Sequence, residues 1–382
     1  MSERLYFLDW LRVIAVGFVF LVHCLLPFAG GSWIVVDADS TTLVAILVGI
    51  FNQFGIPLLF LVSGAGVWYA LRSRTAKQFI QERFQRLIIP FIFGIILFSP
   101  IQTYFHLRQN EEFDGTLFHH YLPQFFRANH FTIRDFQWVG SYGYHLWFLF
   151  FLFAFSLVSL SLFIYLRQRT HIIDLLASVS QIKGASLLFA IPLLTAQVLL
   201  RSNFSEYLSW ADFVFWLIFF IYGYILVSDK RFIEAIQRDF KYALATLIIS
   251  TLIIILIYIR NDDKTAIQDA MDFYSNLMLF TIAATINSWA SMSILLAITS
   301  RYLNWHQPIL DSLNENALPF YLFHQPPIVV IGFFVTRWEI SSGIKFAIIF
   351  VVSLLITITL YQILIKLFPF TRVWMGMRPV KT

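Results

Sequence analysis

The chain has 382 residues, of which 59% are hydrophobic and 18% aromatic, whereas only 13% are charged. Soluble domains are nearer half apolar and about a quarter charged, so this composition excludes an ordinary soluble domain and indicates an integral membrane protein. The net charge of +5 and the pI near 9.2 are typical of basic cytoplasmic loops and do not indicate nucleic-acid binding. The single cysteine excludes an intramolecular disulfide.

A helix needs about 20 mostly apolar residues to cross the bilayer core. The apolar runs are continuous and do not alternate, which excludes a closed β-barrel. We therefore predict an all-α integral membrane protein, a bundle of about ten transmembrane helices forming one domain over residues 1–382. The expected spans lie near residues 5–27, 43–71, 87–106, 145–166, 185–201, 212–228, 243–259, 274–299, 313–335 and 344–368.

Lys and Arg predict the orientation, because cytoplasmic loops carry the basic excess. The most basic connections are 72–86 and 228–241, whereas residues 28–42 contain no Lys or Arg. Alternating the spans then places both termini in the cytoplasm. The long connections 107–144 and 260–273 are expected on the opposite side.

The first predicted span, "LDWLRVIAVGFVFLVHCLLPF" (8–28), contains Asp9, Arg12 and His23. Charged side chains inside a membrane usually face the bundle interior. Asp9 lies one turn before Arg12, a spacing that suits an ion pair. Arg12 and His23 are three turns apart, roughly 16 Å along the axis, so they would mark two depths of one cavity wall. For Asp9 and Arg12, the alternative is an ion pair at the helix end that reaches the cytoplasm. For His23, it is a buried histidine bonded to a neighbouring carbonyl.

Further polar side chains fall inside later spans. His145 opens the fourth span, and His324 follows Tyr321 by one turn in the ninth. Pro326 and Pro327 have no N–H, so they should free backbone carbonyls near Leu322 and Phe323 and help to shape a polar cavity. The alternative for His324 is a simple helix kink whose polar groups are satisfied internally.

The first span opens with "LDWLR", and ten residues separate its Arg12 from His23. This pattern resembles the membrane-bound acyltransferase 3 family. "FLVSGAGVWYAL" (60–71) resembles the Ser-Gly segment of that family, and "RFQRLIIP" (83–90) its RxxR…P entry into the third span. Three stretches resemble one branch, the glucan succinyltransferases typified by glucan biosynthesis protein C: "YFLDWLR" (6–12), "HLWFL" (145–149) and "YLFHQP" (321–326).

The resemblance implies that an acyl group moves from cytoplasmic acyl-coenzyme A, either succinyl- or acetyl-coenzyme A, to a hydroxyl of a glycan beyond the membrane. It also implies a bacterial inner membrane and no permanently bound cofactor. Arg12, Arg83 and Arg86 would hold the nucleotide end of the donor, since Arg suits bidentate phosphate contact. The alternative for Arg83 and Arg86 is that they only mark the cytoplasmic side.

His23 is the expected general base, because histidine titrates near neutrality. Asp9 would fix Arg12. A second group should polarise the thioester carbonyl, and the candidates are Ser63, His145, Tyr321 and His324.

The alternative function is a proton-coupled secondary transporter, which intramembrane His, Arg and Asp would also suit. No inverted repeat is visible, which favours the enzyme. The adjacent His119 and His120 are too weak a pattern for a metal site, and we expect none.

Overall fold

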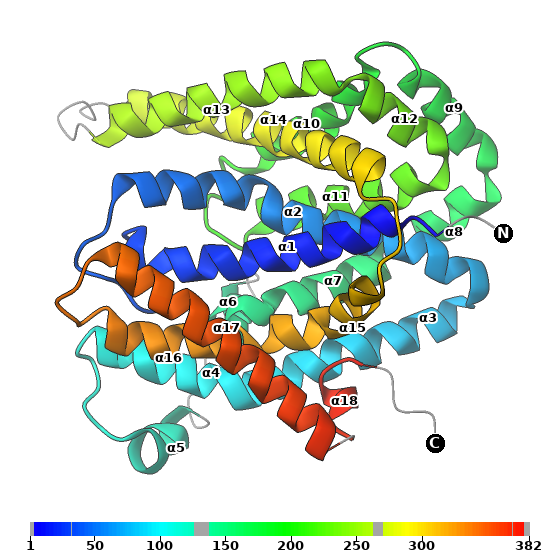
Figure 1. Cartoon of the computed structure of the whole chain (residues 1–382). Helices are drawn as coiled ribbons and strands as arrows, with labels where there is room; N and C mark the ends of the chain where they lie inside the picture. The colour runs from blue at the N-terminus through cyan, green and yellow to red at the C-terminus, as the bar shows by residue number, and fades with distance from the viewer. Residues whose placement is uncertain (1–3, 32, 126–136, 263–269, 369, 378–382) are drawn as a thin grey trace. The chain divides into compact units, whose positions relative to one another are not determined.

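The structure is a computed structural model that describes residues 4–31, 33–125, 137–262, 270–368 and 370–377 (Figure 1). Within these ranges the elements are helices joined by turns, and no strand occurs. The expectation of an all-α protein is therefore confirmed. Parts of the two long connections predicted on the far side, residues 126–136 and 263–269, lie outside the described residues.

The chain contains both long and short helices (Figure 1). The long helices are α1 (Tyr6–Leu25), α2 (Thr42–Ser73), α4 (Ile89–Gln109), α11 (Trp210–Ser228), α13 (Phe240–Asp262), α14 (Ala270–Tyr302) and α17 (Ser342–Leu367). The shorter ones are α3 (Ala76–Arg83), α5 (Leu122–Phe125), α6 (Gln137–Gly143), α7 (Trp147–Val158), α8 (Leu160–Gln168), α9 (Thr170–Ser180), α10 (Ala190–Leu200), α12 (Lys230–Arg238), α15 (Pro308–Phe323), α16 (Gln325–Val335) and α18 (Thr371–Trp374). Some of the helices are flanked by a short segment of tighter or wider helical turns. These segments are η1 (Leu26–Phe28), η2 (Phe84–Ile88), η3 (Leu117–Tyr121), η4 (Tyr144–Leu146) and η5 (Ala185–Phe189).

Eight helical segments of the described chain are long and apolar enough to cross a membrane, so this is a multi-pass membrane protein. The pair α15 and α16, bent by 49°, adds a ninth if it is one span. With that pair counted as one span, the expected count of ten spans is too high by one for the described chain, and the span that is missing is the fifth, 185–201. There the chain forms η5, of five residues, followed by α10, of eleven, which together fall short of about 20 residues. The cytoplasmic placement of both termini stays a prediction.

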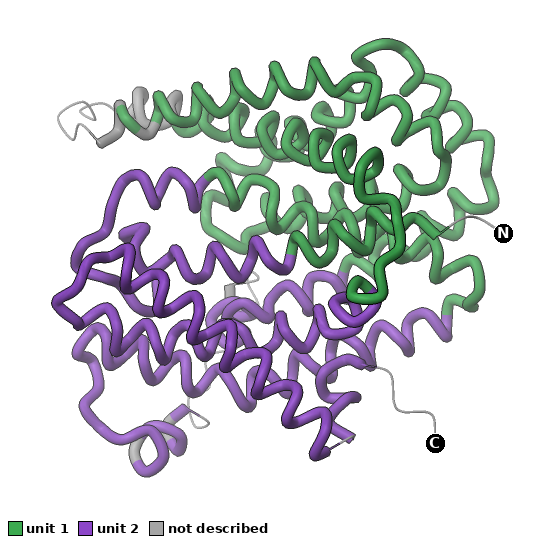
Figure 2. Tube along the Cα trace, in the orientation of Figure 1, with its two compact units in different colours: residues 1–15, 50–76, 155–310 green, residues 16–49, 77–154, 311–382 purple. Residues whose placement is uncertain are grey.

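The chain divides into two compact units, which Figure 2 colours separately. Unit 1 comprises residues 1–15, 50–76 and 155–310, and unit 2 comprises residues 16–49, 77–154 and 311–382. Helices α1 and α2 contribute residues to both units. Each unit is thus built from segments far apart in the sequence.

Within unit 1, α2 and α11 pack backbone against backbone. A Cβ atom on Gly64 would overlap the carbonyl oxygen of Phe220, and one on Gly223 would overlap the carbonyl oxygen of Leu61. Small residues allow such close approach between membrane helices. The Ser-Gly segment of the second span therefore has a packing role, because only glycine fits at position 64.

Gly223→Ala is expected to lower the stability of the protein by about 1–3 kcal/mol, since the added methyl group must push α2 and α11 apart. The matched control is Gly17→Ala in α1, where an added Cβ meets no atom within 4 Å. Thermal unfolding in detergent, followed by tryptophan fluorescence, would compare the two variants. Equal midpoints for both variants would contradict the close contact.

The core of unit 2 lies between the end of α1 and the helices α16 and α17. Phe20, Cys24 and Phe28 pack with Ile328 and Ile349. Cys24 is fully buried in this cluster, which suits a small apolar residue. The connection after α1 is also packed, since its apolar residues Ile34 and Val35 contact Val329 and Phe333.

Candidate active site

Three histidines from distant parts of the chain meet inside unit 2, and we call them the histidine cluster. His23 comes from α1, His145 from η4, and His324 from the break between α15 and α16. The His324 ring centroid lies 4.9 Å from that of His23 and 4.9 Å from that of His145. His145 and His324 are buried, whereas His23 is half-buried. All three were sequence candidates, and the structure brings them together.

A proline creates the place where His145 binds. Pro326 has no N–H, so the carbonyl of Leu322 lacks its ordinary helical partner. The Nε2 atom of His145 lies 3.2 Å from that carbonyl oxygen and donates to it. The freed carbonyl predicted at Leu322 is therefore confirmed, and its partner is a histidine 177 residues earlier in the chain. The same break bends the helix pair by 49° at His324.

The backbone that carries His145 is held in an uncommon conformation. Tyr144, just before it, has φ = 48°, in the left-handed region that costs a non-glycine residue about 1–2 kcal/mol. The Tyr144 hydroxyl lies 2.7 Å from the Thr103 hydroxyl of α4, and the Tyr321 hydroxyl donates to the carbonyl of His145. Strain of this kind persists where the surroundings over-determine it, often at functional sites.

The partners of the ring nitrogens assign the tautomers of His23 and His324. A carbonyl oxygen only accepts, and His324 Nδ1 lies 2.6 Å from the oxygen of Tyr321, so this nitrogen carries the proton. His23 Nδ1 lies 2.8 Å from the oxygen of Val19 and therefore also carries a proton. The same Nδ1 lies 3.1 Å from His324 Nε2, which accepts its hydrogen. In neutral His23 the Nε2 atom is left as the basic nitrogen.

Buried acceptors without a partner lie in the same unit. Among the described residues, His145 Nδ1, Gln102 Oε1 and Gln325 Oε1 are buried and make no hydrogen bond. Buried polar atoms are normally paired. These atoms could therefore accept hydrogen bonds from a hydroxylated ligand. Gln102, inside α4, was missed from the sequence, although a buried amide in an apolar span is a signal of its own.

Asp9, Arg12 and Ser63 belong to unit 1. An Arg12 nitrogen lies 3.7 Å from an Asp9 oxygen, which confirms the predicted ion pair, and Arg4 approaches the same carboxylate at 2.8 Å. The Arg12 guanidinium also lies 4.0 Å from where a Cβ of Gly66 would be. Ser63 is half-buried on α2. A site that joins these residues to the histidine cluster stays a prediction.

Arg83 and Arg86 belong to unit 2, at the start of the third span. The Arg83 guanidinium carbon lies 5.0 Å from the ring centroid of Phe79. Arg86 donates from Nε to the carbonyl of Gly376 at 3.2 Å and lies 3.5 Å from Glu82. In this structure Arg86 thus ties α3 and η2 to the segment after α18.

The family model of the acyltransferase domain, acyltransferase 3, matches residues 5–362, nearly the whole chain. The chain belongs to the acyltransferase 3 family. No curated protein and no solved structure matches it. The protein is therefore a multi-pass membrane acyltransferase that takes an acyl donor and an acceptor.

An acyltransferase of this family needs a group that takes a proton from the acceptor. The histidine cluster offers one, because His23 has a basic Nε2 and an Nδ1–H anchored at Val19 and His324. Once Nε2 takes a proton, the Nδ1–H becomes a charge-assisted donor, which strengthens both of its hydrogen bonds. The cluster can therefore accept a proton and stabilise the charge that results.

Proposed function

We propose that this acyltransferase moves an acyl group from acyl-coenzyme A to a hydroxyl of an extracytoplasmic glycan, with His23 as general base. The observation that carries the proposal is the bonding of His23, whose Nδ1–H faces Val19 and His324 and whose Nε2 is left basic. Histidine is suited to this role at neutral pH. The family match supplies the acyl transfer.

The proposed step is direct transfer. The acceptor hydroxyl gives its proton to His23 Nε2 while its oxygen attacks the thioester carbonyl. The carbon–sulfur bond then breaks, the ester forms, and the thiolate takes the proton back from His23 to leave as free thiol. No covalent acyl-enzyme is needed, because a thiol is a good leaving group.

Polarisation of the thioester carbonyl requires a hydrogen-bond donor. The protons of His145 Nε2, His324 Nδ1 and the Tyr321 hydroxyl are each bound to a backbone carbonyl. We therefore assign these side chains to positioning of the cluster. Ser63 is then the remaining candidate donor, and Asp9 acts through Arg12.

For the donor, we propose that Arg12, Arg83 and Arg86 bind phosphates of coenzyme A. The resemblance to glucan succinyltransferases supports succinyl-coenzyme A over acetyl-coenzyme A, and periplasmic glucan as the acceptor. The same resemblance supports a bacterial inner membrane as the location. The identities of the acyl group and of the glycan do not alter the proton transfer proposed at His23.

The direct test is thiol release by the purified protein in detergent, with succinyl- or acetyl-coenzyme A, in the presence and absence of crude periplasmic glucan. We expect thiol release that depends on the glucan and is faster with succinyl-coenzyme A than with acetyl-coenzyme A. The competing function is a proton-coupled transporter. Absence of release from folded protein, together with donor-independent glycan uptake in proteoliposomes, would support the transporter instead.

A further inference from the structure

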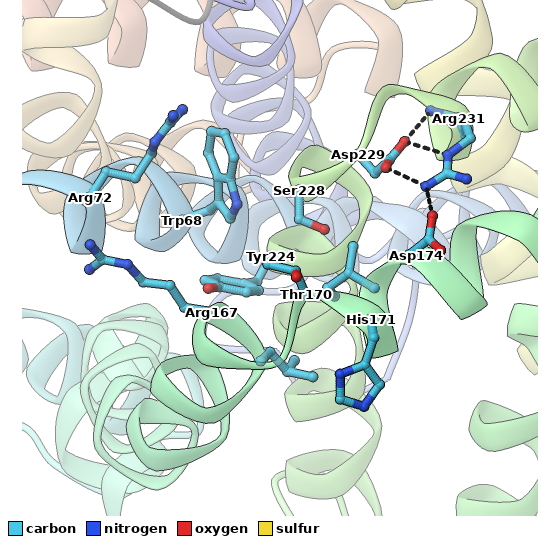
Figure 3. A pocket seen from close by; sticks show the side chains of 12 residues that line it. Trp68, Arg72, Arg167, Thr170, His171, Asp174, Tyr224, Ser228, Asp229 and Arg231 are labelled. Carbon is cyan, nitrogen blue, oxygen red and sulfur yellow. Dashed lines mark hydrogen bonds and ion pairs between the residues drawn. The ribbon is translucent and has the colours of Figure 1, made fainter.

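A cavity of about 690 Å³ lies within unit 1, where the ends of α2, α8 and α11 meet the start of α9 (Figure 3). The contact of Gly64 and Gly223 brings α2 and α11 together beside it. Its volume is in the range of small-molecule sites, about 300–1,000 Å³. The basic connection 228–241 begins at its edge, which predicts that it faces the cytoplasm.

One side of the cavity is basic and aromatic. Figure 3 shows Arg72 and Arg167 on the same side as Trp68 and Tyr224. The Arg72 guanidinium carbon lies 4.4 Å from the ring centroid of Trp68. Arg167 donates to the backbone carbonyl of Leu71, which is a neutral acceptor. This side therefore has cationic groups beside two aromatic rings, Trp68, which is half-buried, and Tyr224, which is buried and stacks on Phe163 with ring centroids 4.2 Å apart.

The opposite side carries one arginine and two aspartates, which are paired with one another. Arg231 lies 2.7 Å from Asp229 and 2.7 Å from Asp174, as the dashed lines of Figure 3 mark. The hydrogen bond from Arg231 holds the pKa of Asp229 below its usual range, so this carboxylate stays ionised and paired. Both aspartates of the lining are thus bound to one arginine, and the lining arginines outnumber them.

We propose that this cavity is a binding site for the adenosine end of the acyl donor, with the ribose phosphate on Arg72 and Arg167 and the base beside the ring of Trp68, so that the diphosphate is left to the arginines of the proposed donor site. The inference deepens the proposed function and rests on it. Arg binds phosphate bidentately, and a nucleobase stacks on an aromatic ring. A lipid headgroup offers the phosphate but no ring to stack, so the aromatic residues favour a nucleotide.

Arg12 also belongs to unit 1, although it does not line the cavity. The Arg12 guanidinium lies against Gly66 of α2, and Arg72 is six residues further along, about 9 Å on the helix axis. Coenzyme A carries a diphosphate and a separate ribose phosphate. Arg12 of α1 and Arg72 of α2 thus lie at two levels along α2, and the ligand has two separate phosphate groups.

The test measures binding of adenosine 3′,5′-bisphosphate by calorimetry, with the full chain in nanodiscs of neutral lipid. We expect Arg167→Gln and Arg72→Gln to weaken binding about tenfold or more, as loss of a charged hydrogen bond does. The matched control is Arg169→Gln, an exposed arginine outside the cavity lining, which should bind like wild type. Arg167→Lys keeps the charge and should bind better than Arg167→Gln, and thermal unfolding shows which variants are folded.

Equal nucleotide affinity in wild type and folded Arg167→Gln would overturn the inference. Loss of nucleotide binding in nanodiscs that contain anionic lipid would also overturn it, since the site would then belong to lipid headgroups. Glucan-dependent thiol release by wild type, assayed separately, tests the proposed function. Release without Arg167-dependent binding refutes only the cavity, whereas Arg167-dependent binding without release refutes only the transfer reaction.

Discussion

His23→Asn is expected to lower the rate of acyl transfer by about 10²–10⁴-fold, the usual loss when a general base is removed. An asparagine amide can still donate to the carbonyl of Val19, as His23 Nδ1 does at 2.8 Å, but it has no basic nitrogen in place of Nε2. The loss should therefore fall on kcat, with little change in the affinity for acyl-coenzyme A. Thiol release and transfer of labelled acyl groups to glucan measure both quantities.

His324 supplies the matched pair of variants for this experiment. Its Nε2 accepts from His23 at 3.1 Å, and glutamine can place an acceptor at the same level, whereas leucine cannot. We expect His324→Leu to lower kcat about tenfold or more, as removal of a hydrogen bond to a charged group predicts. His324→Gln should lower kcat less. Wild-type kcat in His23→Asn, with both proteins folded, would exclude His23 as the base.

Simple physical rules predicted the members of the site from the sequence. Polar side chains in apolar spans were expected to face the interior, and this rule singled out His23, His145 and His324. The spacing of three residues predicted the Asp9–Arg12 ion pair. Such rules work because each depends on one helix and the membrane around it.

What could not be predicted depends on partners far away in the chain. The bond between His145 and the freed carbonyl of Leu322 joins residues 177 apart, and the contact of His23 with His324 joins residues 301 apart. The tautomers follow from these contacts and so were also out of reach. Gly64 belonged to a recognised segment, but the reason for a glycine there is the backbone of Phe220.

A buried ion pair also escaped the sequence analysis. Lys345, in the first turn of α17, lies 2.7 Å from Asp37 in the connection after α1, with side-chain exposures of 5% and 0%. Lys345 also donates to the carbonyl of Thr336 at 3.0 Å. The pair fixes the connection that carries Trp33, whose ring centroid lies 6.4 Å from that of His23. No local pattern links two residues 308 apart.

Breaking this pair from one side is expected to cost about 3–5 kcal/mol, because an uncompensated charge is then left buried. Asp37→Asn and Lys345→Met should each show this loss in unfolding experiments on the detergent-solubilised protein. The double variant should recover much of it, since two neutral side chains leave no buried charge. The control is Lys230→Met at the exposed pair with Glu234, where no measurable change is expected.

The double-mutant cycle separates this account from a general loss of packing. If the two single losses simply add in the double variant, the residues act independently and the ion pair does not hold the connection. If they couple, the stability of the connection depends on the pair.

Folded Asp37→Asn should then also bind the acceptor less well while keeping its affinity for acyl-coenzyme A, because the connection carrying Trp33 contacts the cluster at His23. A glucan KM that stays at the wild-type value would show that this connection only supports the fold.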